Sequence, residues 1–255
     1  MLKEKRKRKI ISLIESKESV SVPELASLFD VSKMTIRRDL QELGDLGQLE
    51  RTHGGAILSI KGENQVEPPL FDRMNIMATE KHQIAKMISE LIGPKEMVFL
   101  GSGSTTTFIA RELVSRDDIT VVTNALTVMD ELARSAKMTL IGVGGFLRRN
   151  EISFYGHFSE KILQDLHVDK VIMGMRGIHP RYGLTSDHPQ ELATDRAIMN
   201  TSEVLIIAAD HTKIGNVASA RVAPIESATM IVTTKRAPMN LVNEIERLSV
   251  KVIRV

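Results

Sequence analysis

Residues 21–43, SVPELASLFDVSKMTIRRDLQEL, decide the fold of the N-terminal part of this chain. Ser21 and Glu24 have the spacing of a capping box, which predicts that a helix begins there. Asp30 tolerates the left-handed backbone of a tight turn, and Ser32 can cap a second helix. The segment therefore predicts two short helices joined by a tight turn.

The second of these helices separates an apolar face from a cationic face. Ile36, Leu40 and Leu43 recur at helical spacing and are expected to face the core. The polar side chains opposite them match the geometry that places a recognition helix in the major groove of DNA. We therefore predict that this helix binds double-stranded DNA. The predicted contact residues are Ser32, Lys33, Met34, Thr35, Arg37 and Arg38.

A β-hairpin, or wing, is predicted after the second helix. Gly54 and Gly55 are able to take the positive φ of a hairpin turn, and short strand-like segments flank them. Arg51 and His53 lie near the predicted tip, where they are placed to contact phosphate or the minor groove. Winged helices also serve as protein-interaction modules, and this alternative explains the charges as merely solvated. That alternative gives no reason for the cations of the second helix to share one face, whereas binding in a DNA groove does.

Composition limits the classes of protein that need considering. The chain has 255 residues, of which 42% are hydrophobic, enough for a core in one large domain or two unequal ones. Its net charge is only +2, so the distribution of cations matters more than their excess. Six of the first nine residues are Lys or Arg, although a frayed, solvated terminus explains that cluster equally well.

The absence of cysteine excludes disulfides, thiolate zinc sites and thiol catalysis, and it fits a cytoplasmic location. No window of the sequence approaches the roughly 18 apolar residues that a membrane helix needs. We expect a protein that is not exported and does not bind membranes.

The rest of the chain alternates short apolar runs with amphipathic segments. We predict a winged helix-turn-helix over residues 1–58, a linker over 59–74 containing Pro68 and Pro69, and a larger domain over 75–255. Continuous apolar runs predict strands that are covered on both faces. These runs are 97–100, 119–122, 138–143, 171–175, 204–208, 230–232 and 250–255. Helices are predicted at roughly 77–92, 105–116, 125–136, 157–167, 189–201 and 239–248. The alternation predicts a doubly wound, mostly parallel α/β sheet.

A loop rich in Gly, Ser and Thr follows the first of these strands. It runs through Gly101, Ser102, Gly103, Ser104, Thr105 and Thr106 and leads into a predicted helix. Glycines let the backbone approach an anion, and the free N–H groups and hydroxyls at a helix N-terminus supply donors. The loop lacks the lysine of a Walker A motif and the third glycine of a dinucleotide fingerprint. It predicts a phosphate site, although a plain strand-to-helix turn explains the same residues.

Other predicted strands end in polar residues that converge on the same edge of the sheet. In open α/β sheets, ligands bind beyond the carboxyl ends of the strands. The candidates are Thr123, Asn124, Gly145, Arg148, Asp210 and Lys213. Each taken alone is equally well explained as a surface charge or a satisfied loop residue. Arg148 and Lys213 carry the positive charge that a phosphate needs.

These motifs resemble those of the DeoR family of bacterial transcription regulators over nearly the whole chain. The resemblance is carried by Val31 to Leu40, His53 to Ala56, Gly101 to Thr106, Gly144 to Arg148 and Ala209 to Lys213. It implies that the chain is a repressor of carbohydrate operons. It also implies a sensor domain similar in fold to ribose-5-phosphate isomerase, with a phosphorylated sugar as effector. Glu80-Lys81 belongs to the same pattern, so Lys81 joins the predicted effector site.

Two expectations concern assembly and chemistry. Paired recognition helices read repeated half-sites, so we expect a homodimer or homotetramer. An isomerase-like enzyme with a fused interaction module is the alternative, because Asp187, Glu191, Asp210 and Lys213 are types that such catalysis uses. Their spacing shows no dedicated acid–base pair, so we expect no enzyme activity. The seven histidines are scattered, and we expect neither a metal site nor a cofactor.

Overall fold

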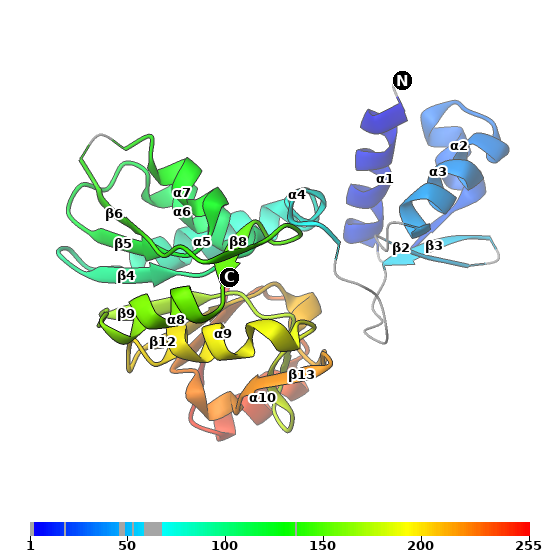
Figure 1. The fold of residues 1–255 in the computed structure, drawn as a ribbon. Coiled ribbons are helices and arrows are strands. Elements are labelled where there is room, and N and C mark those ends of the chain that lie inside the picture. The colour runs from blue at the N-terminus through cyan, green and yellow to red at the C-terminus, as the bar shows by residue number, and fades with distance from the viewer. Residues whose placement is uncertain (1–2, 18, 46–48, 53, 59–67, 136) are drawn as a thin grey trace. The chain divides into compact units, whose positions relative to one another are not determined.

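The computed structural model describes residues 3–17, 19–45, 49–52, 54–58, 68–135 and 137–255. The chain divides into two compact units (Figure 1). The smaller unit comprises residues 1–68 together with Asn75–Met77, and the larger comprises Pro69–Met74 together with Ala78–Val255. The chain between the two main bodies therefore passes from one unit to the other more than once.

Three helices form the body of the smaller unit: α1 (Lys3–Lys17), α2 (Val22–Phe29) and α3 (Lys33–Asp45). Their apolar faces meet in one core. Side chains from α1, α2 and α3 that are almost fully buried there include Ile10, Ile14, Leu25, Ile36 and Leu40. The predicted helix-turn-helix is thus present as α2 and α3, with α1 as the third helix of the bundle.

The wing is a three-stranded antiparallel sheet in the order β1 (Ser19–Ser21), β3 (Gly55–Leu58), β2 (Leu49–Arg51). Gly54 and Gly55 are able to take a positive φ, but Gly55 does not adopt one. Gly55 is needed for a different reason, because a Cβ there would lie 1.9 Å from the carbonyl oxygen of Val20. Glycine at this position permits the close approach of β3 to β1.

The larger unit is built on a seven-stranded parallel sheet, and each predicted apolar run supplies one of its strands. The strands are β4 (Met97–Leu100), β5 (Thr120–Thr123), β6 (Thr139–Gly142), β9 (Lys170–Met173), β12 (Leu205–Ala208), β14 (Met230–Thr233) and β15 (Lys251–Arg254). Their spatial order is β15-β14-β12-β9-β4-β5-β6. In register, Val98 of β4 lies opposite Val121 of β5 and Lys170 of β9. The predicted α/β class is confirmed.

Helices cover both faces of this sheet. One face packs against α5 (Ala78–Glu90), α6 (Ser104–Leu113) and α7 (Leu126–Leu132). The other packs against α8 (His157–Gln164), α9 (Leu192–Met199) and α10 (Met239–Arg247). Along β4, Val98 and Leu100 belong to the first core and Phe99 to the second. Two buried faces explain why the strands read as continuous apolar runs.

Short antiparallel elements complete the larger unit, and the sequence analysis did not predict them. A hairpin is formed by β7 (Phe146–Arg148) and β8 (Ser153–Tyr155), and a small sheet has the order β10 (Gly177–His179), β11 (Gly183–Ser186), β13 (Ala220–Ala223). Three short 3₁₀ helices, Pro189–Glu191, His211–Lys213 and Ile225–Ser227, join neighbouring elements in the described chain.

The segment predicted as a linker differs from expectation in its last part. Residues 59–67 lie outside the described residues. Leu70–Arg73 forms the short helix α4, and Leu70 is fully buried. The proline pair precedes this helix, because Pro69 provides an N-terminal boundary rather than interrupting a helix. In the described part of the chain, no helix has the length and apolarity needed to cross a bilayer.

Candidate functional site

The turn between α2 and α3 is fixed by its capping residues. Ser21 Oγ accepts the amide of Glu24 at 3.2 Å, as predicted. The reverse arm of the capping box differs from expectation, because the Glu24 carboxylate binds Lys17 Nζ at 2.6 Å. Asp30 takes the predicted left-handed conformation with φ 51°, and Ser32 Oγ accepts the Thr35 amide at 3.1 Å. These caps set the direction in which α3 leaves the turn.

A buried ion pair holds α3 against α1. Arg6 Nε lies 2.6 Å from Asp39 Oδ2, and the two residues are only 7% and 1% exposed. The hydrogen bond with Asp39 raises the pKa of Arg6, against the opposing effect of burial. Lys7 Nζ also lies 2.6 Å from Glu42 Oε2. Two members of the N-terminal cationic cluster thus belong to a helix and serve packing, which rules out a frayed terminus for them.

The opposite face of α3 is exposed and cationic. Lys33, Arg37 and Arg38 are exposed, and Met34 between them is 70% exposed. Arg38 Nε lies 3.6 Å from Glu42 Oε1, and the Arg38 side chain remains 79% exposed. Thr35 is half-buried, and its hydroxyl shares a 2.9 Å hydrogen bond with Ser32. The structure therefore places the predicted contact residues of this helix on one outward surface.

The predicted contacts from the wing are less fully described. Arg51 ends β2, and its backbone lies opposite Ala56 of β3. His53 lies outside the described residues. The Val22 amide donates to Gly54 O at 2.8 Å, which ties the turn of the wing to the start of α2.

The loop predicted to bind phosphate lies between β4 and α6 at the carboxyl edge of the sheet. Gly103 precedes α6 with φ +131°, a conformation that favours glycine. Its carbonyl oxygen accepts the hydroxyls of Thr106 and Thr107, both at 2.9 Å. The first amides of α6 have no partner within the helix, so they are available to an anion. Within the described chain, the hydroxyls of Ser104 and Thr105 form no hydrogen bond.

Positive charge lies around Asp210, which follows β12 at the same carboxyl edge of the sheet. Lys81 of α5 is 4% exposed, and its Nζ donates to Arg73 O at 2.7 Å. Burial would raise the pKa of Asp210, but Lys213 and Lys81 outweigh that effect and hold it below its usual value. Asp210 Oδ1 also accepts the Thr212 amide at 2.9 Å. Two predicted lysines thus share the electrostatic environment of one predicted carboxylate.

The polar residues at the carboxyl end of β5 are buried as well. Thr123 Oγ1 accepts the Ala125 amide at 3.0 Å, and Asn124 Nδ2 donates to Phe154 O at 2.7 Å. Asn124 is 5% exposed, and its Oδ1 has no hydrogen-bond partner among the described residues. Gly145 has a packing role, since a Cβ there would lie 2.2 Å from Ser159 Oγ. This close contact explains the glycine without a ligand.

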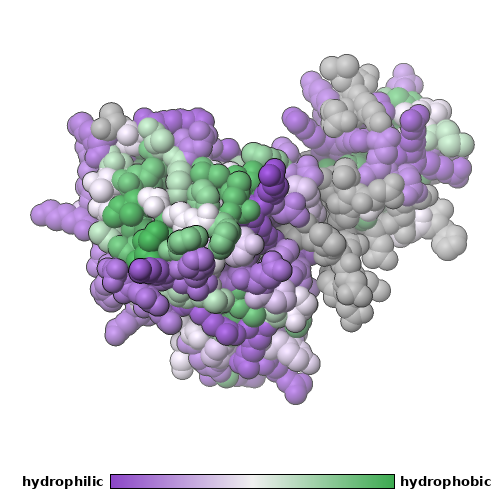
Figure 2. All heavy atoms as spheres, in the orientation of Figure 1, coloured by the Kyte–Doolittle hydropathy of each residue, from purple (hydrophilic) through white to green (hydrophobic). Residues whose placement is uncertain are grey.

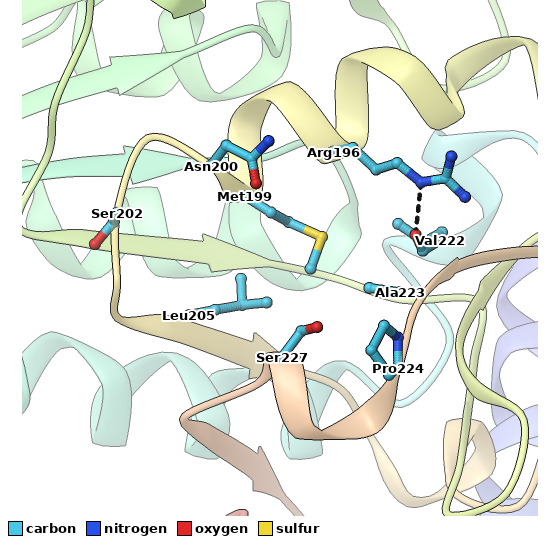
Figure 3. Close-up of a pocket in the computed structure, with 9 residues that line it drawn as sticks. All are labelled: Arg196, Met199, Asn200, Ser202, Leu205, Val222, Ala223, Pro224 and Ser227. Carbon is cyan, nitrogen blue, oxygen red and sulfur yellow. Dashed lines mark hydrogen bonds between the residues drawn. The ribbon is translucent and has the colours of Figure 1, made fainter.

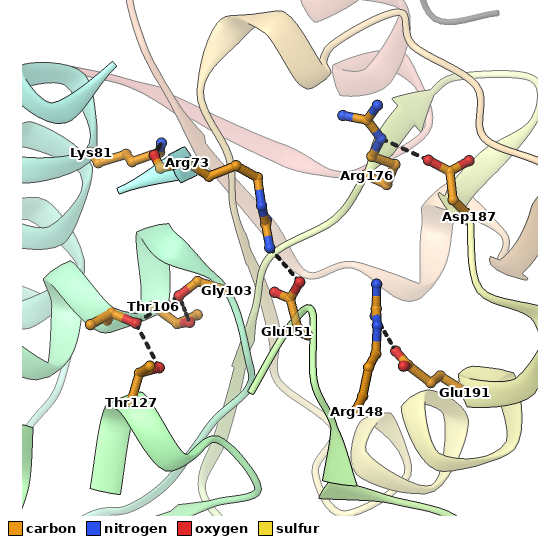
Figure 4. A network of polar contacts seen from close by, with 11 residues as sticks. Arg73, Lys81, Gly103, Thr106, Thr127, Arg148, Glu151, Arg176, Asp187 and Glu191 are labelled. Carbon is orange, nitrogen blue, oxygen red and sulfur yellow. Dashed lines mark hydrogen bonds and ion pairs between the residues drawn. The ribbon is translucent and has the colours of Figure 1, made fainter. Parts of the chain in front are cut away.

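Arg148 belongs to a network of ion pairs beyond the loop (Figure 4). Its Nη1 lies 2.6 Å from Glu191 Oε2, so its charge already has a partner. Arg73 of α4 pairs with Glu151 of the β7–β8 hairpin. Arg176 Nε lies 2.8 Å from Asp187 Oδ2. The expectation that Arg148 is available to neutralise phosphate is weakened by its pairing with Glu191.

Asp195 of α9 is a member of this region that the sequence analysis missed. Burial, together with Glu191 and Glu151, raises its pKa to about 7, against the opposing effect of Arg148. Only the spacing of Asp195 from Glu191, one helical turn, was visible in the sequence, and that spacing is common on solvent-exposed helices.

A separate pocket of about 400 Å³ lies beside α9 and the start of β12 (Figure 3). Met199, Leu205 and Pro224 line it, and Arg196 at its rim donates to Val222 O at 2.8 Å. Leu205 is the first residue of β12, so this pocket lies at the amino edge of the sheet. Ligands of open parallel sheets bind at the opposite edge, where the Gly103 loop lies. Among the described residues, no group of His, Asp and Glu side chains is arranged to hold a metal ion.

The fold and these two surfaces define a class of protein. A winged helix with an outward cationic recognition helix is joined to an α/β domain that carries a loop suited to anions. The chain matches the model of the DeoR-like helix-turn-helix domain over residues 6–61 and that of the DeoR C-terminal sensor domain over residues 76–235. It belongs to the DeoR family and is a DNA-binding regulator rather than an enzyme.

Curated relatives resemble the chain over most of its length. A putative aga operon transcriptional repressor of Escherichia coli O157:H7 is 31% identical over 98% of this chain and 93% of its own. The glycerol-3-phosphate regulon repressor of Escherichia coli K12 is 31% identical over 91% of each chain. Transcriptional repressor AccR of Agrobacterium fabrum is 32% identical, over 89% of this chain and 88% of its own.

Solved structures show only a distant similarity. Ribose-5-phosphate isomerase A of Methanocaldococcus jannaschii is 15% identical with a TM-score of 0.39, over 52% of each chain. The β subunit of eIF2B from Chaetomium thermophilum has a TM-score of 0.41 over 60% of this chain and 50% of its own. At these scores the similarity adds nothing about activity.

Proposed function

We propose that this protein represses a carbohydrate-utilisation operon, binds its operator through α3 and the wing, and responds to a phosphorylated sugar. The observation that carries the proposal is the division of α3 into two faces. Ile36 and Leu40 anchor it in the core, while Lys33, Arg37 and Arg38 point outward. A rigid helix that is anchored on one face and cationic on the other suits the major groove.

The effector part of the proposal depends on the Gly103 loop. A sugar phosphate would place its phosphate against the amides and hydroxyls of residues 101–106, with Lys81 and Lys213 supplying positive charge. Thr123, Asn124 and Asp210 would bind the hydroxyls of the sugar. The names of two relatives, an aga operon repressor and a glycerol-3-phosphate regulon repressor, agree with control by such metabolites.

Self-association would allow two winged helices to bind paired half-sites. Figure 2 shows hydrophobic residues gathered on the larger unit. Exposed apolar side chains on the β7–β8 hairpin and α8 include Phe146, Leu147 and Phe158, and the rings of Phe146 and Phe158 lie 5.7 Å apart. An exposed apolar cluster of this kind supports a homodimer or homotetramer. Binding to chromosomal DNA would place the assembly in the cytoplasm.

Arg37→Ala and Arg38→Ala test the DNA interface. Each is expected to weaken binding to the protein's own promoter region by about 1 to 3 kcal/mol if a base is contacted, or nearly equally for all sequences if only phosphate is contacted. Gel-shift titrations at fixed salt measure the effect. Lys86→Ala, an exposed lysine of α5 in the larger unit, is the matched control and should bind as the wild type does. Unchanged binding by both arginine variants would remove them from the interface.

The double substitution Ser104→Ala and Thr105→Ala tests the effector site. It is expected to leave DNA binding intact and to abolish the response to sugar phosphates, because two unpartnered donors of the loop are lost. Calorimetry against a panel of pentose, hexose and triose phosphates measures affinity. Ser202→Ala, at the amino edge of the sheet, is the control for the second pocket. Undiminished affinity in the double variant would exclude the Gly103 loop as the phosphate site.

A further inference from the structure

The chain between the two units follows an unusual path. After residue 68 it enters the larger unit as Pro69–Met74, returns to the winged-helix unit as Asn75–Met77, and re-enters the larger unit at Ala78. A simple linker would pass from one unit to the other only once. Three residues of the winged-helix unit are therefore bracketed on both sides by residues of the sensor domain.

Both flanking segments are held by contacts within the larger unit: the first is bound to the turn between β7 and β8, and the second is bound to the first. On the first side, Arg73 of α4 forms an ion pair with Glu151, and Leu70 N donates to Asn150 O at 2.9 Å. On the second side, Lys81 Nζ donates to the carbonyl oxygen of Arg73 at 2.7 Å. Figure 4 shows the Arg73 side chain reaching Glu151, with Lys81 next to Arg73. A Cβ placed on Gly103 would lie 3.7 Å from Glu151 Oε1.

The bracketed residues contribute to the core of the winged helix. Met77 is 1% exposed and belongs to the same apolar cluster as Ile10, Leu25 and Leu40. Its φ is 51°, a conformation that a non-glycine residue adopts at a cost and that packing must maintain. A displacement of Asn75–Met77 would therefore disturb the core on which α3 rests.

We propose that Asn75–Met77 couples the phosphate loop to the winged helix, with Arg73 and Glu151 as positioning residues. The proposal rests on the proposed function, in that an anion is assigned to the Gly103 loop. Such an anion repels Glu151 and attracts Arg73 and Lys81, so it alters the bonds that hold both ends of the segment. Occupancy of the loop then changes how Met77 packs and how α3 is held, which is the differential interaction that regulation requires.

Hydrogen–deuterium exchange on the full-length protein tests the coupling, with inorganic phosphate as the probe. Arg73→Gln removes the Arg73–Glu151 ion pair, which lies two residues before Asn75–Met77. Arg176→Gln removes the Arg176–Asp187 pair of the same network, whose two residues lie far along the chain from Asn75–Met77. Without phosphate, Arg73→Gln is expected to raise exchange in α1 and α3 at least about threefold, whereas Arg176→Gln leaves it at the wild-type rate. The double variant Arg73→Glu with Glu151→Arg exchanges the two charges and should restore the protection of the α1 and α3 amides.

With phosphate present, wild type and Arg176→Gln should show changed exchange in both the Gly103 loop and α3, and Arg73→Gln only in the loop. If α1 and α3 behave alike in Arg73→Gln and Arg176→Gln without phosphate, the coupling proposal is overturned. If phosphate leaves the Gly103 loop unchanged in wild type, the proposed effector site fails instead, and the phosphate-free comparison still decides the coupling.

Discussion

The winged-helix unit and the sensor domain use charge in different ways. In the smaller unit, the Arg6–Asp39 pair is buried behind α3, while the cations of the outer face stay exposed. In the larger unit, Arg73 is already paired with Glu151 and Arg148 with Glu191. The first arrangement leaves a fixed cationic surface free for the DNA that is proposed to bind it. The second would place ion pairs that can break close to the proposed ligand.

Breaking the Arg6–Asp39 pair is expected to have the largest effect. Asp39→Ala leaves a buried guanidinium without its carboxylate, which should cost about 3 to 5 kcal/mol in the stability of the winged-helix unit. Hydrogen exchange of α1 and α3 amides measures that loss. The double variant Arg6→Met with Asp39→Leu should recover most of it, since no charge remains buried. If Asp39→Ala alone were as stable as wild type, the pair would have no supporting role.

Two adjacent glycines of the wing test how closely β3 approaches β1 in the smaller unit. Gly55→Ala forces a Cβ against Val20 O and should destabilise the smaller unit by about 1 to 3 kcal/mol. Gly54→Ala meets no atom within 4 Å and should change stability by less than about 0.5 kcal/mol. Urea unfolding followed by exchange of β1 amides distinguishes them. Equal losses in both variants would contradict the close approach of β3 to β1.

Asp195 provides a test in the sensor domain. Its pKa is raised from 3.8 to about 7, so the folded state prefers the protonated acid. Its contribution to stability is fully present below pH 3.8 and is lost as the pH rises towards 7. Asp195→Asn cannot ionise and should stabilise the larger unit by roughly 2 kcal/mol near neutral to mildly alkaline pH. Thermal unfolding across this range measures the difference, and an unchanged pH profile in the variant would show that Asp195 is not responsible.

The smallest effect is expected at the cap of α3. Ser32→Ala loses the bond to the Thr35 amide and should cost about 1 kcal/mol. Ser32→Asp retains the cap, but it adds a negative charge beside the face that is proposed to bind DNA. It should therefore keep stability and lose operator affinity. If both variants bound DNA as the wild type does, Ser32 would contribute only to the fold.

The sequence was sufficient for the main sheet because both faces of each strand are buried, which makes the strands continuous apolar runs. The hairpin of β7 and β8 was missed, since strands such as Phe146–Arg148 are short and mix apolar with charged residues. For the recognition helix, the periodicity of Ile36, Leu40 and Leu43 sufficed to separate the two faces. The Arg73–Glu151 pair was beyond prediction, because its partners are 78 residues apart and neither belongs to a motif.

The path of residues 75–77 has a practical consequence for anyone who divides this protein. A fragment that ends at Leu58, or even at Pro68, includes the helices and strands described in the smaller unit but omits Met77. Such a fragment would expose the apolar side chains that Met77 covers. If it bound DNA weakly, the cause would be the missing core residue and not the missing sensor domain. A fragment boundary after residue 77 avoids that defect.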